Sequence, residues 1–111
     1  MVEKSASIKN PSYEKNKRVF ADGSERNVAN LPTLSISRGV YKPGWRWSEH
    51  AGSQTGKESA RHIGYIISGS IMIKDTTGQE IAVYPGEAFE VGPNHDAWVI
   101  GGEPCVALDF E

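Results

Sequence analysis

The chain has 111 residues, of which 38% are hydrophobic and 23% charged, and its formal net charge is −2. This length predicts one domain with one core, and the nearly balanced charge argues against a nucleic acid or an anionic membrane as a partner. No run of residues is apolar enough for a signal peptide or a membrane-spanning helix. The one cysteine, Cys105, excludes an intrachain disulfide and, within an apolar segment, is expected to be buried and inert. We therefore expect a cytoplasmic protein.

Strand signals dominate the chain once its polar start has passed. Residues 1–17 are polar and aperiodic, which predicts an extended N-terminal arm, and residues 18–111 are expected to form a single domain. From residue 34 onward, strand-like segments are separated by turns rich in glycine and proline. Because no segment has a convincing helical period, the pattern predicts an all-β sandwich or barrel. The expected strands are residues 34–41, 45–50, 62–67, 71–74, 80–84, 88–91, 96–100 and 105–110.

Two segments resemble the two sequence motifs of the cupin superfamily. Gly44, followed by five residues and His50, matches the start of the first motif, and Gly69, six residues after the glutamate position held here by His62, matches its end. Residues 84–95 (YPGEAFEVGPNH) resemble the second motif. More narrowly, the chain is similar to short, single-domain cupins of unassigned function. The resemblance implies a double-stranded β-helix, a jelly-roll barrel that is often dimeric, with an internal pocket where many cupins bind Fe, Mn, Ni or Zn.

The chain also departs from the cupin motifs. The second histidine of the first motif is replaced by Gly52, and His62 stands in place of the motif's glutamate. The usual histidine position of the second motif aligns with Ala97, two residues after His95. Residues two apart on a strand share a face, so His95 is still expected to point inward. The usual three histidines and one glutamate are therefore reduced to three histidines.

His50, His62 and His95 are the only histidines of the chain and form the predicted metal site. Three neutral imidazoles can hold one divalent transition metal (Zn, Fe, Ni or Mn) and leave a coordination position for water or substrate. Glu58, in the loop that precedes His62, is a candidate fourth ligand or general base. The alternative is that the three histidines are hydrogen-bonded pocket residues that hold no metal.

The segment that ends at His50 carries the predicted substrate-binding residues. Strict alternation places Trp45 and Trp47 on one face of this strand and turns Arg46, Ser48 and His50 to the other. If that second face lines the barrel, Arg46 can bind a substrate carboxylate with two hydrogen bonds. If the register is shifted by one residue, the tryptophans face inward and Arg46 lies on the surface. We take the first arrangement as the prediction.

The sequence as a whole predicts a small metal-binding cupin barrel that acts on, or binds, a small polar molecule with a carboxylate. The alternative is a non-catalytic ligand-binding or sensing barrel without a metal, and a purely structural dimeric barrel is a third hypothesis. Val19 and Phe20 form an apolar patch beside the polar arm, which favours a homodimer. No residue of the chain is singled out as catalytic.

Overall fold

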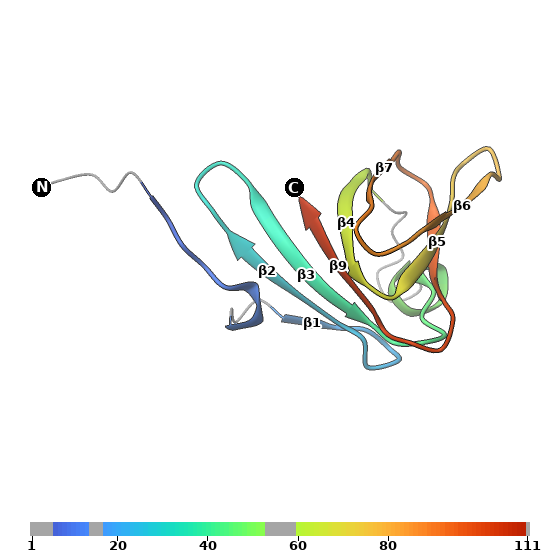
Figure 1. The fold of residues 1–111 in the computed structure, drawn as a ribbon, viewed down its shortest axis with the longest axis horizontal. Helices are drawn as coiled ribbons and strands as arrows, with labels where there is room; N and C mark the ends of the chain where they lie inside the picture. Colours follow the sequence, from blue (N-terminus) through green and yellow to red (C-terminus); the bar gives the residue numbers. More distant parts are fainter. Residues whose placement is uncertain (1–5, 14–16, 53–59, 111) are drawn as a thin grey trace, which may run out of the picture.

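The structure is a computed structural model that describes residues 6–13, 17–52 and 60–110 (Figure 1). In this part of the chain, regular structure is almost entirely β-strand, which confirms the predicted all-β fold. The elements are η1 (Pro11–Tyr13), β1 (Lys17–Val19), β2 (Glu25–Asn30), β3 (Ser35–Tyr41), η2 (Ser48–Gly52), β4 (His62–Ser68), β5 (Ser70–Lys74), β6 (Glu80–Val83), β7 (Ala88–Val91), β8 (Asp96–Ile100) and β9 (Cys105–Phe110).

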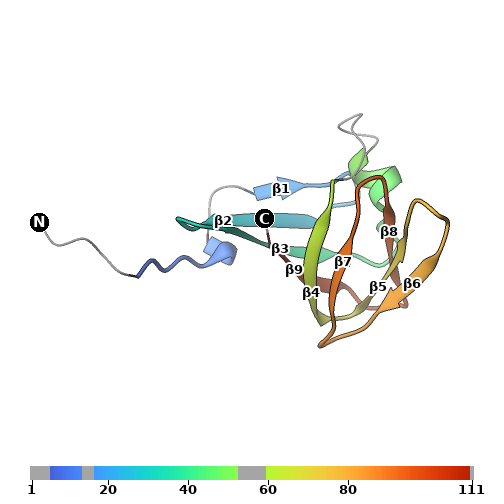
Figure 2. The ribbon, with the colours of Figure 1, turned by 90° about the horizontal axis from the view of Figure 1, so that it is seen from above.

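The strands form two antiparallel sheets, and Figure 2 shows strands β4 to β8 gathered at one end of the molecule. The larger sheet has six strands in the order β1-β2-β3-β9-β4-β7, and the smaller has three in the order β6-β5-β8. Strand β9, the last of the chain, pairs with both β3 and β4 and so lies at the centre of the larger sheet. The core fills the space between the two sheets.

Residues 45–50 do not form the predicted strand. Only Arg46 makes a β-bridge, to Trp98 of β8, and the chain then enters η2, a single π-helical turn. This turn is closed by hydrogen bonds from the backbone N–H groups of Glu49 and His50 to the Arg46 carbonyl, at 3.2 and 2.9 Å. The alternation of side chains between two faces therefore stops after Trp47. Ser48 and His50 do not take the strand positions that the sequence predicted for them.

The tryptophans face inward, the reverse of the predicted arrangement. Trp45 packs against Phe20 and Tyr41, with ring centroids 5.6 and 4.4 Å away, and the three rings belong to the buried core. Burying an indole removes a large apolar surface from water, whereas burying a guanidinium carries a desolvation cost. The register that places Arg46 on the surface is therefore the one adopted.

The register of the larger sheet aligns one row of inward-facing side chains across five strands. Directly paired residues share a face of a sheet, and the successive partners here are Arg18, Arg26, Gly39, Ala107 and Ile66. The residues at the middle of this row are small, and the two at its β1–β2 end are cations. The row therefore leaves space above the sheet centre and brings positive charge to one side of it.

A neighbouring row shows why glycine is required in β4. Gly64 pairs with Phe89 on one side and with Asp109 on the other. A Cβ atom at Gly64 would lie 2.6 Å from the Phe89 ring and 2.9 Å from an Asp109 carboxylate oxygen. The absence of a side chain lets the ring and the carboxylate lie close together over the strand.

The N-terminal residues 6–10 extend away from the two sheets (Figure 1). Ile8 in this segment is 94% exposed. Residues Pro11–Tyr13 then form η1, which contacts β2 and β3. None of the helical turns in the described residues is long and apolar enough to cross a membrane.

Candidate functional site

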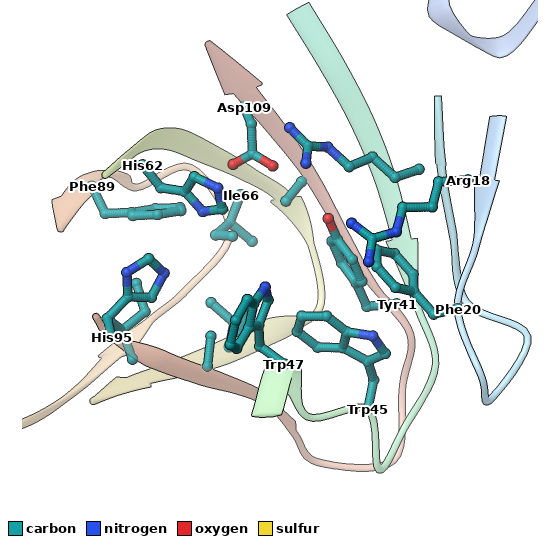
Figure 3. A pocket seen from close by; sticks show the side chains of 15 residues that line it. Arg18, Phe20, Tyr41, Trp45, Trp47, His62, Ile66, Phe89, His95 and Asp109 are labelled. Atoms are coloured by element: carbon teal, nitrogen blue, oxygen red, sulfur yellow. The ribbon is translucent and has the colours of Figure 1, made fainter. Parts of the chain in front are cut away.

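A cavity of about 70 Å³ lies between the two sheets (Figure 3). Aromatic and aliphatic side chains form most of its wall. The charged and imidazole side chains that reach it are Arg18, Arg26, His62, His95 and Asp109. Figure 3 shows His62 and His95 together on one side of the cavity and Arg18 on the opposite side. The imidazoles and Arg18 therefore lie at two separated ends of a cavity whose wall is otherwise largely apolar.

His62 and His95 come together although 32 residues separate them in the chain. His62 opens β4, and His95 lies directly before β8, with the ring centroids 5.2 Å apart and an interplanar angle of 61°. The turn before His95 contains Asn94 with a φ of 63°, a conformation that asparagine tolerates better than most residues. Two of the three predicted ligands therefore lie side by side in the cavity wall.

A hydrogen bond fixes the tautomer of His95. Its Nδ1–H donates to the Gly92 carbonyl at 2.8 Å, and the ring is almost fully buried. With the proton on Nδ1, the neutral imidazole carries its lone pair on Nε2. In metal-binding histidines, the ring nitrogen that does not bind the metal usually donates a hydrogen bond, often to a carbonyl, and this bond orients the ring. His95 can therefore accept a hydrogen bond or bind a cation through Nε2.

His50, the third predicted ligand, does not line the cavity. Its Nδ1 accepts a hydrogen bond of 2.9 Å from the backbone N–H of Arg46, and the residue belongs to the π-helical turn η2. An accepting Nδ1 places the ring proton on Nε2, so the lone pair is already used by the backbone. The sequence placed His50 on a regular strand, and the turn instead gives it a capping role.

Arg46 and Ser48, the predicted substrate-binding residues, also lie outside the cavity lining. The Arg46 guanidinium stacks over the Trp98 ring at 4.1 Å and lies 3.5 Å from an Asp96 carboxylate oxygen. Ser48 donates to the same carboxylate from its backbone N–H and its hydroxyl, at 3.0 and 2.8 Å. These contacts tie the start of η2 to β8. The two residues stabilise the wall from outside, and neither provides the predicted carboxylate clamp.

Sequence reasoning missed the two arginines that do reach the cavity. Arg18 of β1 and Arg26 of β2 are direct cross-strand partners. The Arg26 Nη2 donates to the Ser37 hydroxyl at 3.0 Å, and Arg18 lies 4.7 Å from the centre of the Phe20 ring. Arg18 and Phe20 are two residues apart, directly before a turn that contains Asp22 and Gly23, and that spacing was the available signal for a shared face.

Asp109 and Tyr41 add a second buried polar feature. Asp109 is only 5% exposed and reaches the cavity from the centre of the larger sheet. Burial raises the pKa of the Tyr41 phenol well above its ordinary value, the Asp109 carboxylate raises it further, and Arg26 and Arg18 partly oppose this. The phenol therefore stays protonated, and one carboxylate and two guanidinium groups act electrostatically on the same region.

The described donor set does not amount to the predicted metal centre. Across residues 6–13, 17–52 and 60–110, no three histidine, cysteine, aspartate or glutamate side chains are grouped so that they could hold one metal ion. Glu58, the candidate fourth ligand, lies outside the described residues. The fit to a metal is therefore limited to the two imidazoles of His62 and His95.

Comparison with known proteins identifies the fold. No protein-family model and no curated protein match the chain, but solved structures do. KdgF from Halomonas sp. is 18% identical with a TM-score of 0.65, over 96% of this chain and 93% of that one. A cupin-like protein from Thermotoga maritima is 14% identical with a TM-score of 0.63, over 88% and 73% of the two chains.

A third solved structure carries the superfamily name itself. A sugar phosphate isomerase from a cupin superfamily, of Silicibacter pomeroyi, is 14% identical with a TM-score of 0.62, over 85% of this chain and 68% of that one. At such identities the similarity establishes the fold alone. The chain has the cupin fold, the all-β jelly-roll barrel implied by its two motifs.

Proposed function

We propose that this protein is a cupin barrel whose cavity binds a small polar molecule that carries a carboxylate. The observation that carries the proposal is the placement of Arg18, Arg26, Asp109 and two histidines around one largely apolar cavity. Taking charged groups out of water is unfavourable unless they are paired or used. A barrel that served only as a structural unit would be more stable with apolar residues at these positions.

The charge of the cavity wall favours an anionic ligand. Among the described residues of the wall, two guanidinium groups face one carboxylate, so the charged side chains there are mostly cationic. Hydrogen bonds from guanidinium to carboxylate are strong and directional, and they become stronger where water is excluded. The sequence assigned the binding of the ligand carboxylate to Arg46. We assign it instead to Arg18 and Arg26 of the β1–β2 hairpin.

A metal-dependent form of this function is the second candidate, and the His62–His95 pair favours it. A divalent transition metal such as Zn, Fe, Ni or Mn, bound by these two imidazoles, would supply a Lewis acid at the histidine end of the cavity. The hydrogen bond from His95 Nδ1 to the Gly92 carbonyl suits this use of Nε2. Direct binding by the protein's own cations needs no further ligand and is the form we favour.

The first experiment measures ligand binding in protein treated with a chelator. Thermal unfolding is recorded with a series of carboxylic acids of two to six carbons and with the corresponding neutral amides. A ligand at roughly 100 times its Kd stabilises by about 2.7 kcal/mol, which raises Tm by roughly 10 °C in a domain of this size. We expect acids to raise Tm and amides to have no effect. If no acid binds, with or without added metal, the proposal is wrong.

Metal content distinguishes the two forms of the function. Elemental mass spectrometry is applied to untagged wild-type protein and to the His62→Ala and His50→Ala variants. A near-stoichiometric metal that is lost in His62→Ala and kept in His50→Ala, together with acid binding only in the metal-loaded protein, would establish the metal-dependent form. Acid binding that is unchanged after removal of all metal would establish the direct form.

A further inference from the structure

Arg18 and Arg26 form an unusual pair because two like charges lie directly opposite each other on neighbouring strands. They are Cα partners in the β1–β2 ladder and both line the cavity. Directly opposed side chains in a sheet have Cβ atoms about 5 Å apart, and like charges at that distance destabilise the pairing. An anion that both guanidinium groups contact would help to offset this repulsion.

The contacts of Arg18 fit an anion site. In the described part of the chain, its guanidinium lies over the Phe20 ring and within 3.5 Å of the Ala51 carbonyl oxygen. These contacts orient the group, but neither of them carries a negative charge. Asp109 is the one carboxylate among the described residues of the cavity lining. Arg18 therefore brings to the β1–β2 end of the cavity a positive charge that can bind an anion.

The size of the cavity limits what can bind there. About 70 Å³ provides room for roughly five to seven water-sized atoms, because one such atom occupies about 10–15 Å³. That number corresponds to an acid of two to four carbons. Figure 3 shows the imidazoles of His62 and His95 across the cavity from Arg18, so the far end of such a molecule would reach a hydrogen-bonding group.

From the proposed function, on which this inference rests, we infer that Arg18 and Arg26 bind the carboxylate of a hydroxy or oxo acid of two to four carbons. The hydroxyl or carbonyl group of that acid then lies toward His62 and His95. His95 accepts a hydrogen bond from a ligand hydroxyl at Nε2, because its Nδ1 proton is held by Gly92. Larger acids such as citrate are expected to bind more weakly, because they have more atoms than the cavity volume accommodates.

The test is a calorimetric titration with glycolate, using glycolamide as the neutral analogue of the same shape and citrate as an acid that is too large. Arg18→Gln and Arg26→Gln are each expected to weaken glycolate binding at least tenfold. Arg38→Gln is the matched control, because Arg38 lies one strand over on the opposite face of the same sheet, and it should change the Kd by less than twofold. Glycolamide and citrate are expected to bind at least tenfold more weakly than glycolate.

Thermal unfolding of each variant shows whether it is folded. Arg26 contacts Ser37, so Arg26→Gln can lose stability, and Arg18→Gln alone then decides the question because Arg18 lies on a short edge strand. Equal glycolate affinity in wild type and Arg18→Gln would overturn the inference, as would equal binding of glycolamide. In the first case acid binding by the wild type would leave the proposed function standing, whereas equal binding of the amide would also contradict recognition of a carboxylate. Failure of every acid to bind the wild type would instead overturn the proposed function itself.

Discussion

The two faces of the six-stranded sheet have opposite characters, and each is the reverse of what a simple barrel would show. The inner face carries Arg18, Arg26 and Asp109 toward the cavity. The outer face is apolar at its centre, where Ile63, Tyr65 and Ile67 of β4 are 45%, 38% and 46% exposed. The adjoining strand β9 continues this outer patch with half-buried apolar side chains, which are Val106, Leu108 and Phe110.

This difference indicates that the two faces of one sheet bind different kinds of partner. Polar groups on an inner face are costly and indicate a ligand. A contiguous apolar patch on an outer face is equally unfavourable in water and indicates a protein partner. We propose that the partner is a second copy of the chain, because exposed and half-buried apolar side chains of two neighbouring strands, β4 and β9, form the centre of the patch, with the charged residues Arg38 and Glu90 paired beside them. The following predictions alter one face at a time.

The largest effect is expected from placing a charge on the outer face. Tyr65→Glu puts a carboxylate at the centre of the proposed dimer interface, where it would be buried without a partner. We expect the dimer dissociation constant to rise at least 100-fold, or about 3 kcal/mol. Sedimentation velocity at micromolar concentration measures the change.

The matched control for this variant is Tyr84→Glu. Tyr84 is 54% exposed and lies in the turn after β6, outside the strands β4 and β9 that form the outer patch. It should leave the sedimentation coefficient unchanged. A wild-type protein that sediments as a monomer at micromolar concentration would rule out the dimer.

The next largest effect is expected on the inner face, at Gly64. Gly64→Ala places a methyl group against the Phe89 ring and Asp109, and overpacking of this kind costs about 2 kcal/mol of unfolding free energy. Urea denaturation measures the loss. Gly102→Ala serves as the control, because an added Cβ there meets no atom within 4 Å, and it should change stability by less than about 0.5 kcal/mol. Equal stability of the two variants would contradict the packing described for this face.

The sequence predicted the β-strands from residue 62 onward well, because their apolar runs are bounded by clear turns. The inner position of His95 also followed from the sequence, since it precedes the strand that contains Ala97 and Val99, both of them buried. Alternation specifies which residues share a face, but it does not specify which face is inward. That limit explains the error at Arg46, where the register depended on how Trp45 packs against rings from distant segments.

The two arginines could not be identified from the sequence for a different reason. Arginine is most often a surface residue, and Arg18 lies next to the boundary predicted for a solvated arm. Its inward position follows from pairing with Arg26 in a hairpin whose inner face is covered by other strands. His50 was misplaced because a π-helical turn has no simple signal in a single sequence. Both errors arise where tertiary context overrides local pattern.

The smallest effect concerns the dry end of the inner face, at Cys105. As expected from the sequence, the thiol is fully buried, and burial raises its pKa from 9.0 to about 11. Between these values the unfolded chain has lost the proton while the folded chain keeps it. The unfolded state then binds fewer protons, so stability falls as pH rises, by about 1 kcal/mol between pH 9 and 10.

Cys105→Ala isolates this contribution, because the comparison is between slopes of stability against pH rather than between absolute stabilities. Urea denaturation at pH 9 and pH 10 should show a loss in the wild type that is smaller in the variant by about 1 kcal/mol. Tyr41, whose pKa is also raised by burial, contributes mainly above pH 10, so this window excludes most of its effect. Parallel slopes would mean that water reaches the thiol. The packing around Cys105 at this end of the inner face would then be looser than its burial in the structure indicates.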